Sequence, residues 1–103
     1  MAKIETMIGF AIRAGKIIYG AERIYQNKNA KIIIICHTLA DNSKKKLLEK
    51  RLPNQKIIVT KALLEDIVYK TNCKAIAITD INFAKSILDG INGDYALIDF
   101  SSK

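Results

Sequence analysis

The chain has 103 residues, of which 50% are hydrophobic and 26% are charged, a composition typical of a folded globular protein. It carries 17 lysine and arginine residues against 10 aspartate and glutamate residues, so its formal net charge is +7. This balance favours polyanionic partners such as RNA, DNA or an anionic membrane, although a basic protein can also be merely soluble. The length predicts a single domain over residues 1–103 with one sizeable core.

Neither a membrane segment nor a secretion signal is visible in the chain. The longest apolar run covers residues 32–36, far below the roughly 20 residues that span a bilayer. The N-terminal segment carries charges at Lys3 and Glu5, unlike the apolar part of a signal peptide. Cys36 and Cys73 adjoin apolar runs and are predicted to be buried free thiols. We therefore expect a cytoplasmic protein without a disulfide framework.

Helical and extended patterns alternate in the first half of the chain. Apolar residues recur at helical spacing from Ile4 to Ile12, and Gly15 then ends the helix. The isoleucine run before Cys36 is typical of a central strand that is buried on both faces. In chain order we expect a helix over 4–13, a strand over 16–19, a short helix over 21–27, a strand over 31–36, and a helix that is capped by Asp41, Asn42 or Ser43 and runs to about 52.

The second half continues this alternation. Thr60 and Asp80 each precede a helical pattern, so we expect them to cap those helices, and Gly90 to end the last one. The expected elements are a strand over 57–59, a helix with apolar positions from 63 to 68, a strand over 75–78, a helix up to about 88, and an edge strand over 95–100. The alternation predicts an α/β domain whose helices cover both faces of one partly parallel sheet.

The stretch from Lys16 to Arg23 joins the first strand to the second helix and contains Gly20. Glycine lets the backbone approach a ligand at a helix N-terminus, where unpaired N–H groups suit a phosphate or a polar base edge. Gln26 and Lys28 lie nearby in sequence and add polar or basic side chains. We therefore expect the ligand-facing edge of the protein here, with RNA as the ligand.

Residues suited to catalysis or metal binding are sparse. His37 is the only histidine, and with Cys36 and Cys73 it lacks the paired spacing and the fourth ligand of a zinc site. No nucleophile elbow, Walker loop or dinucleotide-binding glycine motif occurs in the chain. Asp41 and Asp80 are better explained as residues at helix starts. We expect no enzymatic activity, no metal and no cofactor.

Lys44, Lys45 and Lys46 form the densest cluster of charge in the chain. Leu47 and Leu48 point to the other side of the helix expected here, so the lysines are explained as its solvated face. They are explained equally well as phosphate contacts, because they lie in the first turns of that helix. Both interpretations stay open, and Lys44 and Lys45 remain candidate RNA contacts.

Four motifs follow one another along the chain. The first motif is IGFAIRAGK at residues 8–16, which is followed by Gly20 and Glu22. The other motifs are NAKIII at 29–34, NSKKK at 42–46 and AITDINFAK at 77–85. In this order, and over most of the chain, they resemble the L-seven-Ae family of ribosomal proteins, and most closely its small bacterial, YlxQ-like members.

This resemblance implies a three-layer α/β/α sandwich with a mixed sheet of four to five strands. It also implies binding to kink-turn RNA, a sharply bent duplex with tandem sheared G·A pairs. The best-known binders of the family hold this RNA with Gly-x-Asn-Glu-x-x-Lys at the start of the second helix. The matching positions in this chain are Gly20, Glu22, Arg23 and Gln26. The second contact loop of the family falls on Lys70, Thr71 and Asn72.

Taken together, these features predict a non-enzymatic RNA-binding protein of the L-seven-Ae type, associated with the ribosome or another structured RNA. The predicted RNA contacts are Lys16, Gly20, Glu22, Arg23, Gln26, Lys44, Lys45, Lys70, Thr71 and Asn72. The alternative is a protein-interaction module of the translation machinery. Its basic edge would dock on an acidic partner, such as a translation factor or a ribosomal protein.

Overall fold

The computed structural model describes residues 3–27, 29–50, 55–61, 63–68, 70, 73–91 and 95–98. Within these residues the strands are β1 (Ile17–Tyr19), β2 (Ile32–Cys36), β3 (Lys56–Thr60), β4 (Ala75–Ile78) and β5 (Tyr95–Ile98). The helices are α1 (Lys3–Ala14), α2 (Ala21–Gln26), α3 (Asp41–Lys50), α4 (Leu64–Val68) and α5 (Ile81–Asp89). The strands form one sheet in the order β1-β4-β2-β3-β5.

Strand β2 lies at the centre of this mixed sheet. It pairs in parallel with β3 and antiparallel with β4, and all of its residues are buried. β1 and β5 are the edge strands, paired antiparallel with β4 and β3 respectively. The prediction that the isoleucine run forms a central strand is therefore confirmed, as is an edge position for the last strand.

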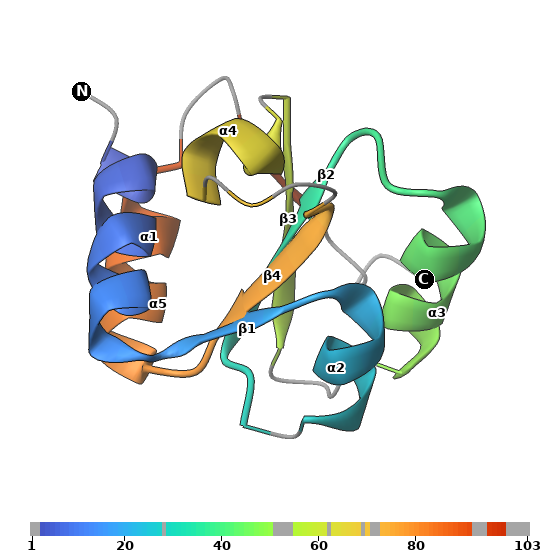
Figure 1. The fold of residues 1–103 in the computed structure, drawn as a ribbon, viewed down its shortest axis with the longest axis horizontal. Coiled ribbons are helices and arrows are strands. Elements are labelled where there is room, and N and C mark those ends of the chain that lie inside the picture. The colour runs from blue at the N-terminus through green and yellow to red at the C-terminus, as the bar shows by residue number, and fades with distance from the viewer. Residues whose placement is uncertain are drawn as a thin grey trace.

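Alternate residues of the central strand pack in two separate hydrophobic cores, one on each face of the sheet. Ile32 and Ile34 pack with apolar residues of α1, α4 and α5 on one face of the sheet. Ile33 and Ile35 pack with Ile24 of α2 and with Leu47 of α3 on the other face. Figure 1 shows the sheet between these two helical layers. The predicted α/β/α sandwich with a mixed sheet is confirmed.

Two predicted helix boundaries follow directly from local chemistry. Gly15 ends α1 with a positive φ of 71°, and the Lys16 N–H then donates to the Ala11 carbonyl at 2.9 Å. At the start of α5, the Asp80 carboxylate accepts hydrogen bonds from the backbone N–H groups of Asn82 at 2.8 Å and Phe83 at 3.2 Å. The predicted cap at Asp80 is therefore confirmed.

Two other predicted caps are wrong. Thr60 is the last residue of β3, paired with Cys36 and Tyr95, and α4 begins only at Leu64. The helix after β2 begins at Asp41, so Asn42 and Ser43 lie inside it, and its Lys44 N–H donates to the Ala40 carbonyl at 2.9 Å. Threonine, asparagine and serine all suit a helix cap, but Thr60 ends a strand and Asn42 and Ser43 lie within a helix. The predicted helix end at 51–52 and strand end at 99–100 lie outside the described residues.

Cys36 and Cys73 are both buried free thiols, as predicted. In the described part of the chain, no helix has the combination of length and apolarity that crossing a membrane requires.

Candidate functional site

The chain turns from β1 into α2 at Gly20. Its φ of 91° and ψ of 138° lie in a region that is accessible almost only to glycine. The Gly20 N–H donates to the Ala75 carbonyl of β4 at 3.0 Å, and the Gly20 carbonyl accepts from the Ile24 N–H at 3.1 Å. Gly20 is the N-cap residue of α2 and has no side chain that could accept a hydrogen bond from the helix. The first backbone N–H groups of α2 therefore receive no side-chain cap from Gly20 at this end of the sheet.

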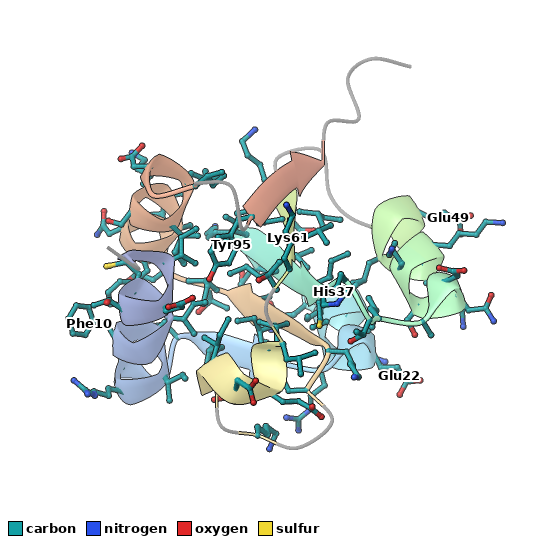
Figure 2. The ribbon with its side chains drawn as sticks, turned by 90° about the horizontal axis from the view of Figure 1, so that it is seen from above. Phe10, Glu22, His37, Glu49, Lys61 and Tyr95 are labelled. Carbon is teal, nitrogen blue, oxygen red and sulfur yellow. The ribbon has the colours of Figure 1, made fainter. Side chains whose placement is uncertain are left out.

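The polar side chains of α2 surround this turn. Glu22, Arg23 and Gln26 are all exposed, and Figure 2 shows Glu22 pointing away from the body of the protein. Arg23 and Gln26 are three residues apart, a spacing that places them on one side of the helix, and Asn27 directly follows the helix. They border an open groove of about 380 Å³ whose lining residues are Ile17, Ile18, Tyr19, Arg23, Gln26 and Asn27.

The second predicted contact segment meets this site through Tyr19. The Nζ atom of Lys70 lies 5.1 Å from the centroid of the Tyr19 ring, and Tyr19 directly precedes Gly20. Burial, and then the negative charge that Cys73 carries when it ionises, raise the pKa of Tyr19 above its ordinary value. Thr71 and Asn72 lie outside the described residues.

Three other predicted contacts lie outside the turn at Gly20 and the helix α2. Lys16 is at the opposite end of β1, where its carbonyl accepts from the Thr79 N–H at 3.0 Å. The three residues of β1 separate it from Gly20, and four steps along a strand span about 13 Å. Lys44 is half-buried and Lys45 exposed on α3, which packs beside α2 on the same face of the sheet. The structure therefore links Lys70 to the turn at Gly20 through Tyr19, places Lys16 at the far end of β1, and places the lysines of α3 on the helix beside α2.

A polar network that the sequence did not indicate lies one strand away from Gly20. The Lys74 ammonium donates to Thr38 Oγ1 at 3.1 Å, and this oxygen lies 3.0 Å from Cys36 Sγ. The exposed His37 donates from Nδ1 to the Thr60 carbonyl at 3.2 Å. Polar residues directly after one apolar run and directly before another are a weak signal for such a network. The antiparallel pairing of β2 with β4 brings them together.

The two thiols have opposite pKa shifts. Burial acts to raise the pKa of Cys36, but hydrogen bonds from Thr38 and the Leu64 backbone, with the positive charge of Lys74, outweigh burial and lower it. Burial raises the pKa of Cys73 and prevails there, although the Ala75 backbone and Lys70 oppose it. Within the described ranges, no group of three His, Cys, Asp or Glu side chains comes close enough together to hold a metal ion.

The chain is similar to a known RNA-binding protein in sequence and to solved structures in fold. No family model matches the chain. The RNA-binding protein YlxQ of Enterococcus faecium is 32% identical over 98 residues, which cover 88% of this chain and 93% of that protein. The structure of a protein of unknown function from Bacillus halodurans C has a TM-score of 0.73 and 23% identity, over 86% of this chain and 96% of that one. The second comparison supports the fold alone.

Proposed function

Because the chain belongs to the YlxQ family, as its motifs predicted, we propose that it binds a structured RNA and prefers a kink-turn to a straight duplex. The RNA is a segment of ribosomal RNA or of another structured transcript. Its proposed contacts are Lys16, Gly20, Glu22, Arg23, Gln26, Lys44, Lys45, Lys70, Thr71 and Asn72. The net charge of +7 supports a polyanionic partner.

The observation that carries this proposal is the contact between Lys70 and Tyr19. It joins the segment before β4 to the turn at Gly20, although the two are far apart in sequence. Arg23 of α2 lines the groove that Tyr19 also borders, so this edge of the sheet carries two cationic side chains and one aromatic side chain. Cations around an aromatic side chain suit both parts of a nucleotide, the phosphate and the base.

Glu22 has a different role in this proposal. A carboxylate repels phosphate groups, so the exposed Glu22 does not contribute to the grip on the backbone. A carboxylate accepts hydrogen bonds from the exocyclic amine of a base, and Arg23 donates to a guanine edge or to a phosphate. In this proposal, Glu22 and Arg23 therefore contact the edges of bases at the start of α2.

The test is a binding titration against a kink-turn RNA and a straight duplex of equal length, each at two salt concentrations. We expect the kink-turn to bind more tightly at both salt concentrations. Equal, salt-sensitive binding to both RNAs would contradict kink-turn recognition and leave only a grip on phosphate. Binding to neither RNA would contradict the proposal and favour an acidic protein partner instead.

A pair of charge-matched variants locates the site. Arg23→Glu with Lys70→Glu should weaken binding about tenfold or more and reduce the slope of log K against log salt by about two, roughly 0.9 for each lost phosphate contact. Lys56→Glu with Lys85→Glu changes the net charge equally at exposed positions on the start of β3 and on α5. This control should keep the slope within about half a unit of wild type. Equal losses in both variants would contradict the location of the site.

A further inference from the structure

The two cysteines of the chain lie close together at one end of the sheet. The Cys36 N–H donates to the Lys74 carbonyl at 2.8 Å, so Cys36 of β2 lies opposite Lys74, the residue that follows Cys73. In such a pair the Cα atoms are about 5.5 Å apart, which places the Cα atom of Cys73 roughly 6–6.5 Å from that of Cys36. Disulfides join Cα atoms that are about 4.4–6.8 Å apart. The backbone therefore brings the two thiols within bridging range.

Both thiols belong to the same side of the sheet. Cys36 and Cys73 pack in one hydrophobic core, between the sheet and the helices α1, α4 and α5. Burial raises the pKa of Cys73, and the charge that Cys36 carries when it ionises adds to this, so the two sulfur atoms are within electrostatic reach of each other. Both are free thiols in this structure. The chain has two cysteines in all, so an intramolecular disulfide has a single possible pairing.

The surroundings of Cys36 favour its thiolate. Its Sγ atom lies 3.0 Å from Thr38 Oγ1 and 3.9 Å from His37 Nδ1. Because Thr38 Oγ1 accepts a hydrogen bond from the Lys74 ammonium at 3.1 Å, its own proton can be donated to the sulfur. Burial acts to raise the pKa of Cys36, but the hydrogen bond from Thr38 and the charge of Lys74 help to outweigh it. The thiolate is the form of cysteine that reacts with oxidants.

Cys36 is close to solvent although its own side chain is buried. His37 and Thr38 contact its sulfur atom and are both exposed, so one layer of side chains separates the thiol from water. Exposed side chains change rotamer within picoseconds to nanoseconds, which admits a molecule as small as hydrogen peroxide. Cys73 keeps its proton more firmly, because burial raises its pKa. The two thiols therefore differ in reactivity, with Cys36 the more nucleophilic.

We propose that Cys36 is an oxidation site for peroxides and that Cys73 converts the oxidised sulfur into a disulfide. The Cys36 thiolate attacks one oxygen of hydrogen peroxide, so an S–O bond forms while the O–O bond breaks and hydroxide leaves. Cys73 then attacks the sulfenic sulfur, so the S–S bond forms while the S–O bond breaks and a second hydroxide leaves. The two thiol protons convert both hydroxides into water, and the peroxide takes up the two electrons that the thiols lose.

Two inert core thiols are the competing interpretation, since buried cysteines commonly serve only for packing. It fits Cys73 taken alone, whose thiol donates weakly to the Ala75 carbonyl at 3.8 Å. It does not account for Cys36, a buried sulfur that contacts a threonine hydroxyl and a histidine ring. The same threonine accepts from the ammonium group of Lys74, a contact that packing alone does not need.

A disulfide at this place acts on the proposed RNA site. The Cys73 N–H donates to the Lys70 carbonyl at 3.3 Å, and the Lys70 ammonium lies 5.1 Å from the centroid of the Tyr19 ring. Joining Cys73 to Cys36 draws Cys73 toward β2, and with it the backbone at Lys70. This link rests on the proposed function, and it predicts that oxidation weakens RNA binding.

The first test follows the mass of the folded wild-type chain in hydrogen peroxide. We expect the loss of two hydrogen atoms, a link between Cys36 and Cys73 in the peptide map, and full reversal by dithiothreitol. A chain that stays reduced would overturn the proposal. Disulfide-linked dimers, or oxidation to sulfinic acid without a disulfide, would overturn it equally.

Four variants test the order of the two steps. Cys73→Ala should stop at the sulfenic acid, which dimedone traps, whereas Cys36→Ala should stay reduced over the same time. Lys74→Gln should slow the oxidation of Cys36 about threefold or more. Lys85→Gln makes the same change of charge at an exposed position on α5 and should leave the rate unchanged. Circular dichroism checks that each variant is folded. Equal rates in the two alanine variants would overturn the assignment of Cys36 as the reacting thiol.

An RNA titration separates this proposal from the proposed function. The oxidised wild-type chain should bind a kink-turn RNA about fivefold or more weakly than the reduced chain, and dithiothreitol should restore the affinity. Cys36→Ala, treated in the same way, should keep its affinity. A disulfide that leaves the affinity unchanged overturns the link to RNA while the oxidation site stands. If the reduced chain binds no RNA, the proposed function is overturned, and the mass measurements decide on the oxidation site by themselves.

Discussion

The Nζ atom of Lys70 lies 5.1 Å from the centroid of the Tyr19 ring, within the range in which a cation is attracted to an aromatic face. Lys70 belongs to the segment between α4 and β4, and Tyr19 is the last residue of β1. The contact therefore joins two elements of the candidate site before any RNA is bound. It also holds an ammonium group close to the turn at Gly20.

This contact should be measurable in the free protein. Lys70→Met and Tyr19→Leu each remove one partner, and we expect a coupling energy of about 0.5–1 kcal/mol between them. Urea unfolding of wild type, both single variants and the double variant gives this value. Tyr19→Phe keeps the aromatic face and should keep most of the coupling to Lys70. Strictly additive effects of the two single variants would show that the contact contributes nothing.

Two glycines should respond in opposite directions to alanine. Gly20 has a φ of 91° that a side chain disfavours, so Gly20→Ala should lower the free energy of unfolding by about 1–2 kcal/mol. Gly9 lies within α1, where alanine is the better helix former, so Gly9→Ala should raise it by about 0.5–1 kcal/mol. An added Cβ meets nothing within 4 Å at either position, so backbone conformation decides both outcomes. Stabilisation by Gly20→Ala, measured by urea unfolding, would contradict this account.

The cap of α5 provides a local test of the fold. Asp80→Ala removes the acceptor for two backbone N–H groups and should cost about 1 kcal/mol in the free energy of unfolding. Hydrogen exchange at Asn82 and Phe83 should also become faster. Asp89→Ala is the control, because Asp89 is an exposed carboxylate in the last turn of α5, where a negative charge is unfavourable. Asp89→Ala should not lower the free energy of unfolding. A larger loss in Asp89→Ala than in Asp80→Ala would contradict the role of Asp80 as the cap of α5.

The two thiols should titrate in different pH ranges. In Cys73→Ala the remaining thiol, Cys36, should ionise below the ordinary pKa of 9.0, and in Cys36→Ala the remaining Cys73 should ionise above it. The ultraviolet absorbance of the thiolate, followed against pH in folded and urea-unfolded samples, measures both. Equal apparent pKa values in the two folded variants would contradict the different environments of the thiols.

The same shifts give opposite effects of pH on stability. The raised pKa of Cys73 gives a contribution that is present below 9.0 and lost as the pH rises through the folded pKa. The lowered pKa of Cys36 gives a contribution that is present above 9.0 and lost as the pH falls through the folded pKa. Across this alkaline range, stability should therefore fall with pH in Cys36→Ala relative to Cys73→Ala. Urea unfolding at several pH values tests the sign.

Most element positions could be predicted because their signals are local. The isoleucine run before Cys36 indicated a strand buried on both faces, and its alternate residues do supply both cores. Asp80 caps α5 through atoms only two and three residues away. Thr60 shows the limit of such reasoning. Its place at the end of β3 depends on pairing with Cys36 and Tyr95, which are distant in sequence.

The candidate site was predictable only in part, for the same reason. Gly20, Arg23 and Gln26 are neighbours in sequence, so their grouping needs only a turn and a short helix. The link from Thr38 to Lys74, and the groove beside Tyr19, depend on which strands are neighbours and in which direction they run. The spacing of apolar residues in the sequence does not indicate which strands are neighbours or in which direction they run.

By itself, the sequence determined the helices, the strands and the turn at Gly20, because hydrophobic periodicity, capping and glycine conformation act over a few residues. Only the tertiary structure decided that β4 lies between β1 and β2. That order places Lys70 over Tyr19 and Lys74 beside Thr38, and it leaves one edge of β1 free. The physical reason is that strand order and register come from hydrogen bonds and packing between residues that are far apart in the chain.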